Sequence, residues 1–222
     1  MQTSTVLDKI LEEVGPLTSL CCLDIEATCW DKGDPNDPGA EHYEVIEIGM
    51  VAIDVATLTI SREISILVKP VEHPVLSDFC VGLTSITNEL LEGKVPDDPN
   101  IPYDIVRTAN FAEAMQVAKV WLEALGDFAW CSWGFYDLHQ LTAEAKRKGA
   151  EMVFPAERHF NAKMIYSKTR RGVKRRGLGA AVKRQNLPFS GTQHRGVDDA
   201  RNVARVILSD QGVVFDPKSP EQ

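Results

Sequence analysis

The stretch Leu20-Cys-Cys-Leu-Asp24-Ile-Glu26-Ala-Thr-Cys29 decides the fold, because it joins an apolar strand to two carboxylates. Side chains alternate between the faces of a strand, so Asp24 and Glu26 point the same way, about 7 Å apart along the chain. Leu23 and Ile25 then point into a core on the opposite face. Carboxylates on so apolar a strand are costly unless a cation compensates their charge. The stretch therefore predicts a divalent-metal site to which later carboxylates contribute.

The composition is that of a globular α/β protein. A chain of 222 residues, 44% of them apolar, fits one large domain with a proper core. No apolar run approaches the roughly 20 residues of a membrane span, and residues 1–13 lack the apolar segment of a signal peptide. Five cysteines, two of them adjacent and none in a C-x-x-C pair, favour reduced thiols in a cytoplasmic protein. We expect no membrane partner.

The charge is distributed unevenly along the chain. The formal net charge is −8, which by itself argues against a nucleic-acid partner. However, residues 158–197 contain eleven Lys or Arg and no Asp or Glu, which leaves −19 for the remainder. This asymmetry is compatible with a polyanion site on an acidic protein, and equally with a solvated basic face.

The first half of the chain predicts a helix followed by three strands. Apolar periodicity favours a helix over 4–14, closed by Gly15-Pro16, and strand one over 18–25. The acids of 31–39 lack the EF-hand pattern and predict a solvated turn rather than a calcium site. Two β-rich runs, 43–54 and 57–68, predict an antiparallel hairpin beside strand one. Glu47, inside the first run, is expected to bond loop backbone near the site rather than a metal.

The second half alternates helices with strands. Short helical turns are expected over 75–92 and a proline-containing loop over 94–107. Helix-type periodicity covers 111–125, and a short buried strand covers 128–133. Asp137 follows that strand and opens a helix to about Lys148. It is thus a second carboxylate at the carboxyl end of a strand, where open α/β sheets place their sites.

The basic segment and the last helix complete the pattern. Helices are expected near 161–167 and 178–186, and a final helix over 197–208 with Asp199 in its first turn. His194 lies just upstream in a loop. We find no linker and expect one domain over 1–222, with a core of about 18–209, a peripheral helix in 1–17 and a tail over 212–222.

The separate segments supply four carboxylates and one histidine: Asp24, Glu26, Asp137, Asp199 and His194. Four carboxylates can hold two divalent ions about 4 Å apart, which clamp the attacking and leaving oxygens of a phosphodiester. Oxygen ligands select Mg²⁺ or Mn²⁺ rather than zinc. A histidine on a nearby loop could deprotonate the attacking water. Each piece alone is common, but their order and spacing together are specific.

The same residues carry a family resemblance. Three segments, 24–29, 132–137 and 194–202, resemble the motifs of the DEDD 3′–5′ exonucleases, in the subtype with a catalytic histidine (DEDDh). The His-x4-Asp spacing makes Asp199, rather than Asp198, the matching ligand. The stretch Ser77-Asp-Phe-Cys80 and the ending Gly-Val-Asp-Asp-Ala-Arg-Asn202 resemble the branch that trims histone mRNA and degrades small interfering RNA in animals.

The resemblance implies a fold and a reaction. The fold would be ribonuclease-H-like, with a five-stranded mixed sheet, its first three strands antiparallel, flanked by helices. The reaction would be 3′–5′ hydrolysis of single-stranded nucleic acid, RNA favoured over DNA, to nucleoside 5′-monophosphates. Two Mg²⁺ or Mn²⁺ ions would be held by the four carboxylates. His194 would be the general base, and Glu26 would be catalytic as well as a ligand.

The resemblance also implies substrate contacts. The terminal nucleotide would lie against the backbone at Ala27 and Thr28, beside His194. Phe79 and Tyr136 would sandwich its base, since stacking grips any base without selecting sequence. The alternative for each ring is ordinary packing.

Four arginines of the basic segment are candidates for phosphate contacts: Arg170, Arg171, Arg175 and Arg176. The main alternative function is a non-catalytic nucleic-acid-binding or regulatory protein that retains the fold.

Overall fold

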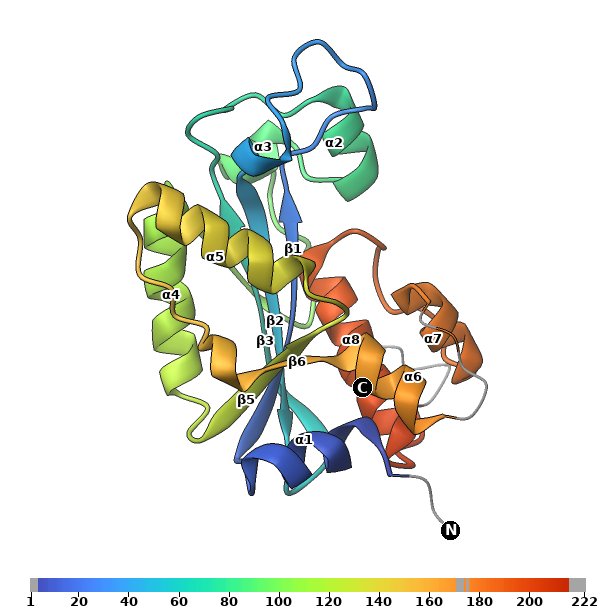
Figure 1. Ribbon diagram of the computed structural model, residues 1–222. Helices are drawn as coiled ribbons and strands as arrows, with labels where there is room; N and C mark the ends of the chain where they lie inside the picture. The colour runs from blue at the N-terminus through green and yellow to red at the C-terminus, as the bar shows by residue number, and fades with distance from the viewer. Residues whose placement is uncertain (1–3, 171–173, 175, 216–222) are drawn as a thin grey trace.

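The computed structural model describes residues 4–170, 174 and 176–215. Its centre is a six-stranded mixed sheet in the order β4-β3-β2-β1-β5-β6 (Figure 1). The strands are β1 (Ser19–Ala27), β2 (Val45–Asp54), β3 (Thr59–Val68), β4 (Asp104–Thr108), β5 (Phe128–Ser132) and β6 (His159–Asn161).

Helices cover both faces of this sheet. They are α1 (Val6–Val14), α2 (Asp78–Thr84), α3 (Asn88–Leu91), α4 (Phe111–Glu123), α5 (Tyr136–Lys148), α6 (Ala162–Thr169), α7 (Leu178–Arg184) and α8 (Gly196–Asp210). Short 3₁₀ turns cover Ala40–His42 and Ala156–Arg158. No helix among the described residues combines the length and the apolar character that a membrane crossing needs.

The two faces of β1 belong to two cores. Leu20 and Cys22 pack with α1, α6 and α8 on one face. Leu23 and Ile25 pack with α4 and α5 on the other. This is the alternation expected from the strand pattern, and it places Asp24 and Glu26 on the α8 face. Figure 1 shows α8 on one side of the sheet and α4 with α5 on the other.

The predicted hairpin is confirmed. β2 pairs antiparallel with both β1 and β3, whereas β5 runs parallel to β1. The first three strands are therefore antiparallel, as the resemblance implies.

The sheet has one strand more than expected, and the loop predicted over 94–107 is wrong in its last part. β4 pairs parallel with β3 and β6 parallel with β5, so both lie at the edges. β4 carries Asp104 and Arg107 and is mostly half-exposed, so it lacks the apolar run that marks a buried strand. β6 has only three residues, too few for a periodic signal.

Candidate active site

β1 presents two carboxylates at its carboxyl end. In the register with β2, Asp24 lies opposite Gly49 and Glu26 lies opposite Glu47. The register shifts immediately after Glu26, which is a bulge that re-aims the chain at Ala27. β1 therefore ends in an irregular segment next to its two carboxylates.

The first turn of α8 is seated directly on β1 and β2, because two glycines allow backbone contact. A Cβ on Gly49 would lie 2.0 Å from backbone atoms of Gly196 and Val197. A Cβ on Gly196 would lie 2.9 Å from the carbonyl oxygen of Asp24. No side chain fits in either place, so the residues at the start of α8 are held over the carboxylates of β1.

Hydrogen bonds to Glu47 stabilise this contact between α8 and the sheet. The fully buried Glu47 carboxylate accepts hydrogen bonds from the Gly196 amide (2.9 Å), the Arg195 guanidinium (3.1 Å) and the Ser65 hydroxyl (2.6 Å). Glu47 therefore bonds the loop backbone, as expected, and its charge is balanced by Arg195.

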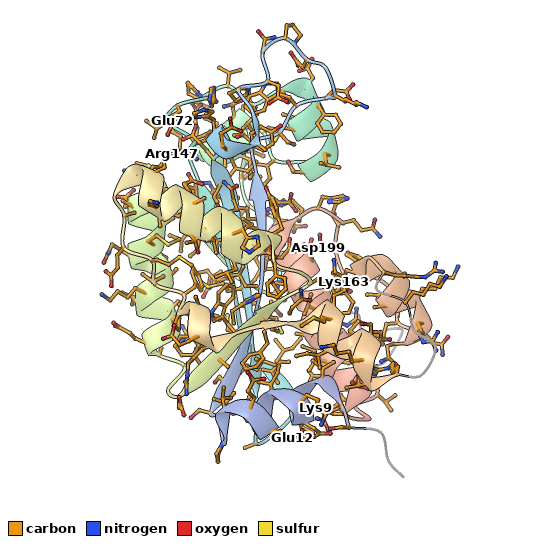
Figure 2. All side chains as sticks on the ribbon, viewed as in Figure 1. Lys9, Glu12, Glu72, Arg147, Lys163 and Asp199 are labelled. Carbon is orange, nitrogen blue, oxygen red and sulfur yellow. The ribbon has the colours of Figure 1, made fainter. Side chains whose placement is uncertain are left out.

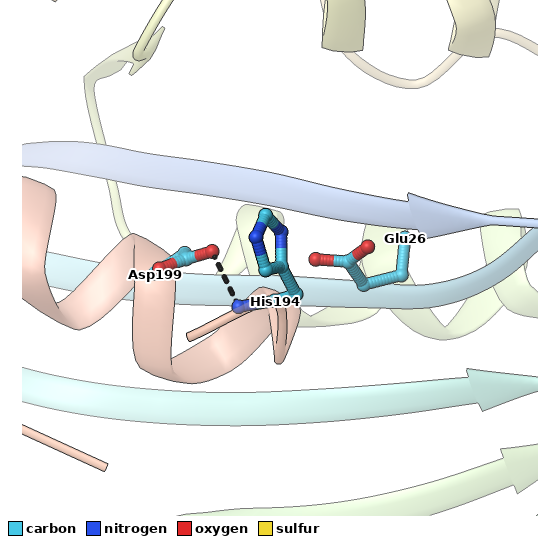
Figure 3. A group of neighbouring side chains, drawn as sticks. All are labelled: Glu26, His194 and Asp199. Atoms are coloured by element: carbon cyan, nitrogen blue, oxygen red, sulfur yellow. Dashed lines mark hydrogen bonds between the residues drawn. The ribbon is translucent and has the colours of Figure 1, made fainter. Parts of the chain in front are cut away.

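The structure brings Glu26, His194 and Asp199 together. Their ligand atoms all lie within 4.8 Å of one another (Figure 3). The Asp199 carboxylate also accepts a hydrogen bond from the His194 amide (3.1 Å), which ties the loop to the helix. His194 is exposed and has a φ of 61°, in the left-handed region that few non-glycine residues occupy. His194 and Asp199 thus lie beside Glu26 at the end of β1.

Asp198 has a different role. Its carboxylate accepts hydrogen bonds from the Thr192 amide (2.8 Å) and from Arg201 (2.6 Å). It is buried and structural, which agrees with the choice of Asp199 as the ligand.

Asp137 reaches β1 from the start of α5. Pairing of β1 with β5 stops at Cys22 and Cys131, which leaves the Ile25 amide free to donate to the Asp137 carboxylate (3.2 Å). Asp137 is 5% exposed. Neither Asp24 nor Asp137 joins the group of three within 4.8 Å. Asp24 lies two residues back along β1, and its carboxylate has a shorter stem than that of Glu26.

Electrostatics nevertheless link all four carboxylates. Burial raises the pKa of Asp24 well above its usual range, and the neighbouring acids raise it further, Asp137 most strongly. Burial and then the charge of Glu47 raise the pKa of Glu26 to about 9. Burial raises the pKa of Asp199 to about 6, opposed by the His194 amide. Burial raises the pKa of Asp137, opposed by hydrogen bonds that include the Ser132 hydroxyl.

These residues fit divalent metal. Buried carboxylates that raise one another's pKa lack compensating positive charge, and a divalent cation would supply it. The four carboxylates offer oxygen donors, which suit Mg²⁺ or Mn²⁺. The group of Glu26, His194 and Asp199 is the part of the site compact enough to share an ion as it stands.

Two of the predicted substrate residues are buried at the end of β1. Thr28 exchanges hydrogen bonds with Glu44: its amide donates to the Glu44 carbonyl (2.8 Å), and its hydroxyl accepts from the Glu44 amide (2.9 Å). The Ala27 carbonyl accepts a weak bond from the Cys80 thiol (3.7 Å). These contacts fix the backbone after the bulge.

The two candidate stacking rings are both accessible. Phe79, in α2, is 42% exposed, and Tyr136, at the start of α5, is 55% exposed. Neither ring is therefore buried in the hydrophobic core.

The arginines predicted for phosphate contact fall into different environments. Arg170 pairs with Asp210 and lies over the Tyr166 ring, 3.8 Å from its centroid. Arg176 is exposed. Arg171 and Arg175 lie outside the described residues.

The contacts that support Asp137 could not be predicted from the sequence, although Ser132 begins the motif segment 132–137. Ser132 is fully buried and its hydroxyl lies 2.9 Å from His159 Nε2. Burial lowers the pKa of His159 to about 4, so its imidazole is neutral. Lys163 also acts on Asp137, whose pKa its charge lowers. Ser132 ends β5, whereas His159 lies in β6, which the sequence did not predict, and Lys163 lies at the start of α6.

Comparisons with known proteins identify the family of this chain. The family model described as Exonuclease (RNase_T) matches residues 21–207. The chain is 29% identical over 198 residues to ERI1 exoribonuclease 2 of Homo sapiens, and the match covers 83% of this chain and 27% of that protein. It is 28% identical over 198 residues to the 3′-5′ exonuclease Snipper of Drosophila melanogaster, covering 86% and 69%.

A solved structure shows the same fold. It is the nuclease domain of 3′hExo, a DEDDh family member, bound to rAMP, with a TM-score of 0.72 at 22% identity. The match covers 88% of this chain and 92% of that one. The match covers about a quarter of the length of the human, Xenopus laevis and mouse ERI1 exoribonuclease 2 proteins. With a family model matched over most of its length, and the three motifs placed around one site, this chain belongs to the RNase_T exonuclease family.

Proposed function

We propose that this chain is a 3′–5′ exonuclease that hydrolyses single-stranded nucleic acid, RNA in preference to DNA, and releases nucleoside 5′-monophosphates. The observation that carries the proposal is the meeting of Glu26, His194 and Asp199 within 4.8 Å, beside two further buried acids. The relatives' names, exoribonuclease and 3′-5′ exonuclease, support the class of substrate and the direction. Residues 18–209 would form the catalytic unit.

Asp24, Glu26, Asp137 and Asp199 would hold two divalent cations, Mg²⁺ or Mn²⁺. When bound, such a pair stabilises the charge that develops on the attacking and leaving oxygens. The protein's part is to hold the carboxylates in fixed positions. The Ile25 amide holds Asp137, and the His194 amide holds Asp199.

His194 would act as the general base. Its ring lies beside the carboxylates of Glu26 and Asp199, so it can reach a water molecule bound among them. The side chain is also exposed, so a proton that it takes from water can pass on to solvent. Asp199 orients the loop that carries it.

The terminal nucleotide would lie over the end of β1 at Ala27 and Thr28. Phe79 and Tyr136 come from different helices, and both rings are accessible to a base. Stacking of this kind holds any base, which suits an enzyme that removes successive nucleotides.

The proposal is tested with a single-stranded RNA labelled at its 5′ end. We expect Mg²⁺ or Mn²⁺ to give a ladder that shortens from the 3′ end, and EDTA or a blocked 3′ end to stop it. The matched DNA should be degraded more slowly. Internal cleavage of the blocked RNA would contradict an exonuclease, and binding without any cleavage would favour a non-catalytic nucleic-acid-binding protein.

A further inference from the structure

A basic pocket of about 480 Å³ lies beside the carboxylate site, between α6, α7 and the segment after β5. Its lining includes five cationic and two aromatic residues: Lys163, Lys174, Arg176, Lys183, Arg184, Trp133 and Tyr166. We call it the α6–α7 pocket. Figure 2 labels Lys163 on this side of the molecule, together with Asp199 of the carboxylate site.

The cations of this pocket form no ion pairs among the described residues. None of the five named above occurs in a salt bridge there. Other cations of the same basic segment are paired, Arg158 with Asp127 and Arg170 with Asp210. Unpaired cations gathered around one cavity favour a polyanionic ligand.

Tyr166 is a second and independent sign of a ligand. The residue is 3% exposed, and its buried hydroxyl has no hydrogen-bond partner among the described residues. Buried hydroxyls nearly always have a partner, because leaving one unsatisfied costs free energy. A phosphate oxygen entering the pocket would accept this hydrogen bond.

Trp133 gives the pocket a rigid wall. Its indole N–H donates to the Arg176 carbonyl (3.0 Å), and its ring lies 5.6 Å from that of Tyr166. The half-buried Trp133 ring offers apolar surface between the cations. A ligand that combines phosphate with flat apolar groups would match both.

Lys163 links the pocket to the carboxylate site. Lys163 lines the pocket, and its Nζ would lie 3.5 Å from a Cβ placed on Gly134. Gly134 lies three residues before Asp137, on which the charge of Lys163 also acts. A chain bound with its 3′ end among the carboxylates could therefore continue past Gly134 into the pocket.

We propose that the α6–α7 pocket binds the phosphodiester backbone of the substrate strand on the 5′ side of its terminal nucleotide, with the Tyr166 hydroxyl donating to a phosphate oxygen. This inference rests on the proposed function, because it assumes that the 3′ end occupies the carboxylate site. It makes the pocket a determinant of substrate length: an oligonucleotide long enough to reach it binds more tightly than a single nucleotide.

The first experiment measures binding of a fluorescent octanucleotide RNA in EDTA, so that nothing is hydrolysed. Tyr166→Phe removes only the unpartnered hydroxyl and should leave the melting temperature unchanged or higher. It should weaken octanucleotide binding by about tenfold, the loss of one charge-assisted hydrogen bond.

The second experiment compares two double variants. Lys183→Ala/Arg184→Ala removes two pocket cations, and Lys119→Ala/Lys146→Ala removes two cations of α4 and α5 as a control. Losing two phosphate contacts should reduce the magnitude of the slope of log binding constant against log salt concentration by about 1.4. Between about 50 and 200 mM salt, binding by the pocket variant should then weaken about sevenfold less than binding by the wild type. The control should keep the wild-type slope.

The p-nitrophenyl ester of thymidine 5′-monophosphate separates this inference from the proposed function, because it is too short to reach the pocket. If Tyr166→Phe and the pocket double variant bind the octanucleotide like the wild type, the pocket assignment is overturned, whether or not the ester is hydrolysed. If octanucleotide binding falls as expected but the wild type hydrolyses neither ester nor RNA, the proposed function fails and the pocket stands. Equal displacement of the octanucleotide by polyglutamate would overturn the assignment to nucleic acid.

Discussion

Replacing Gly49 by alanine should separate the two halves of the site. The added Cβ would lie 2.0 Å from backbone atoms of Gly196 and Val197, where ordinary contact begins at 3.4 Å. The start of α8 would therefore have to retreat by about 1.4 Å, the difference between these distances. Asp199 and His194 would move with it, away from Glu26. A misplacement of about 1 Å can cost about 10²-fold in rate, so we expect at least that loss.

The same variant should lose stability. Overpacking costs about 1–3 kcal/mol or more, which in a chain of this size lowers the melting temperature by about 2–12 °C. Gly82→Ala is the matched control, because a Cβ there meets nothing within 4 Å, on an exposed face of α2. Alanine is the better helix former by about 1 kcal/mol, so this control should be slightly stabilised and fully active.

The assay is RNA hydrolysis with saturating Mg²⁺, run beside thermal unfolding. A Gly49→Ala protein with wild-type activity would show that close contact between α8 and β2 is not needed to assemble the site. If Gly49→Ala does not fold, Gly196→Ala is the milder variant. Its Cβ would lie 2.9 Å from the Asp24 carbonyl oxygen, whereas the Cβ on Gly49 would lie 2.0 Å from the α8 backbone.

Three further predictions concern the site itself. Because the pKa of Glu26 is raised to about 9, the metal-free folded protein keeps a proton that the unfolded chain loses above its ordinary value near 4.5. The free energy of unfolding of the metal-free protein should therefore fall as pH rises from about 5 to 9, and Glu26→Gln should reduce this fall. Calorimetry should find that metal binding releases protons and that the metal affinity increases with pH. His194→Ala should lower kcat by about 10²–10⁴-fold with little change in KM, and a rise in KM alone would contradict a general base. Ser132→Ala should remove a hydrogen bond to Asp137 and weaken metal affinity by about 10–100-fold, as measured by Mn²⁺ titration.

The sequence was most informative where one periodic pattern determined the structure. Alternation along β1 placed Asp24 and Glu26 on one face, and the structure confirms that face as the one covered by α8. His194 and Asp199 lie within one turn of the start of α8, and the His194 amide donates a hydrogen bond to the Asp199 carboxylate.

Contacts between distant segments could not be predicted in this way. Nothing local in the sequence marks Gly49 as the seat of α8, since its role depends on a helix about 150 residues later. Ser132 and Lys163 gain their roles only because β5 and the start of α6 lie side by side behind Asp137. The edge strands β4 and β6 were missed because one carries charges and the other is very short.

The most direct test of the central claim is the product of RNA hydrolysis by the wild type and by Asp24→Asn/Asp199→Asn. We expect the wild type with Mg²⁺ in ¹⁸O-labelled water to release nucleoside 5′-monophosphates that carry the label on phosphate. The double variant should keep the fold, by circular dichroism, and release none. Wild-type release of mononucleotides by the folded double variant would contradict the account, as would a wild-type product that carries a 3′-phosphate.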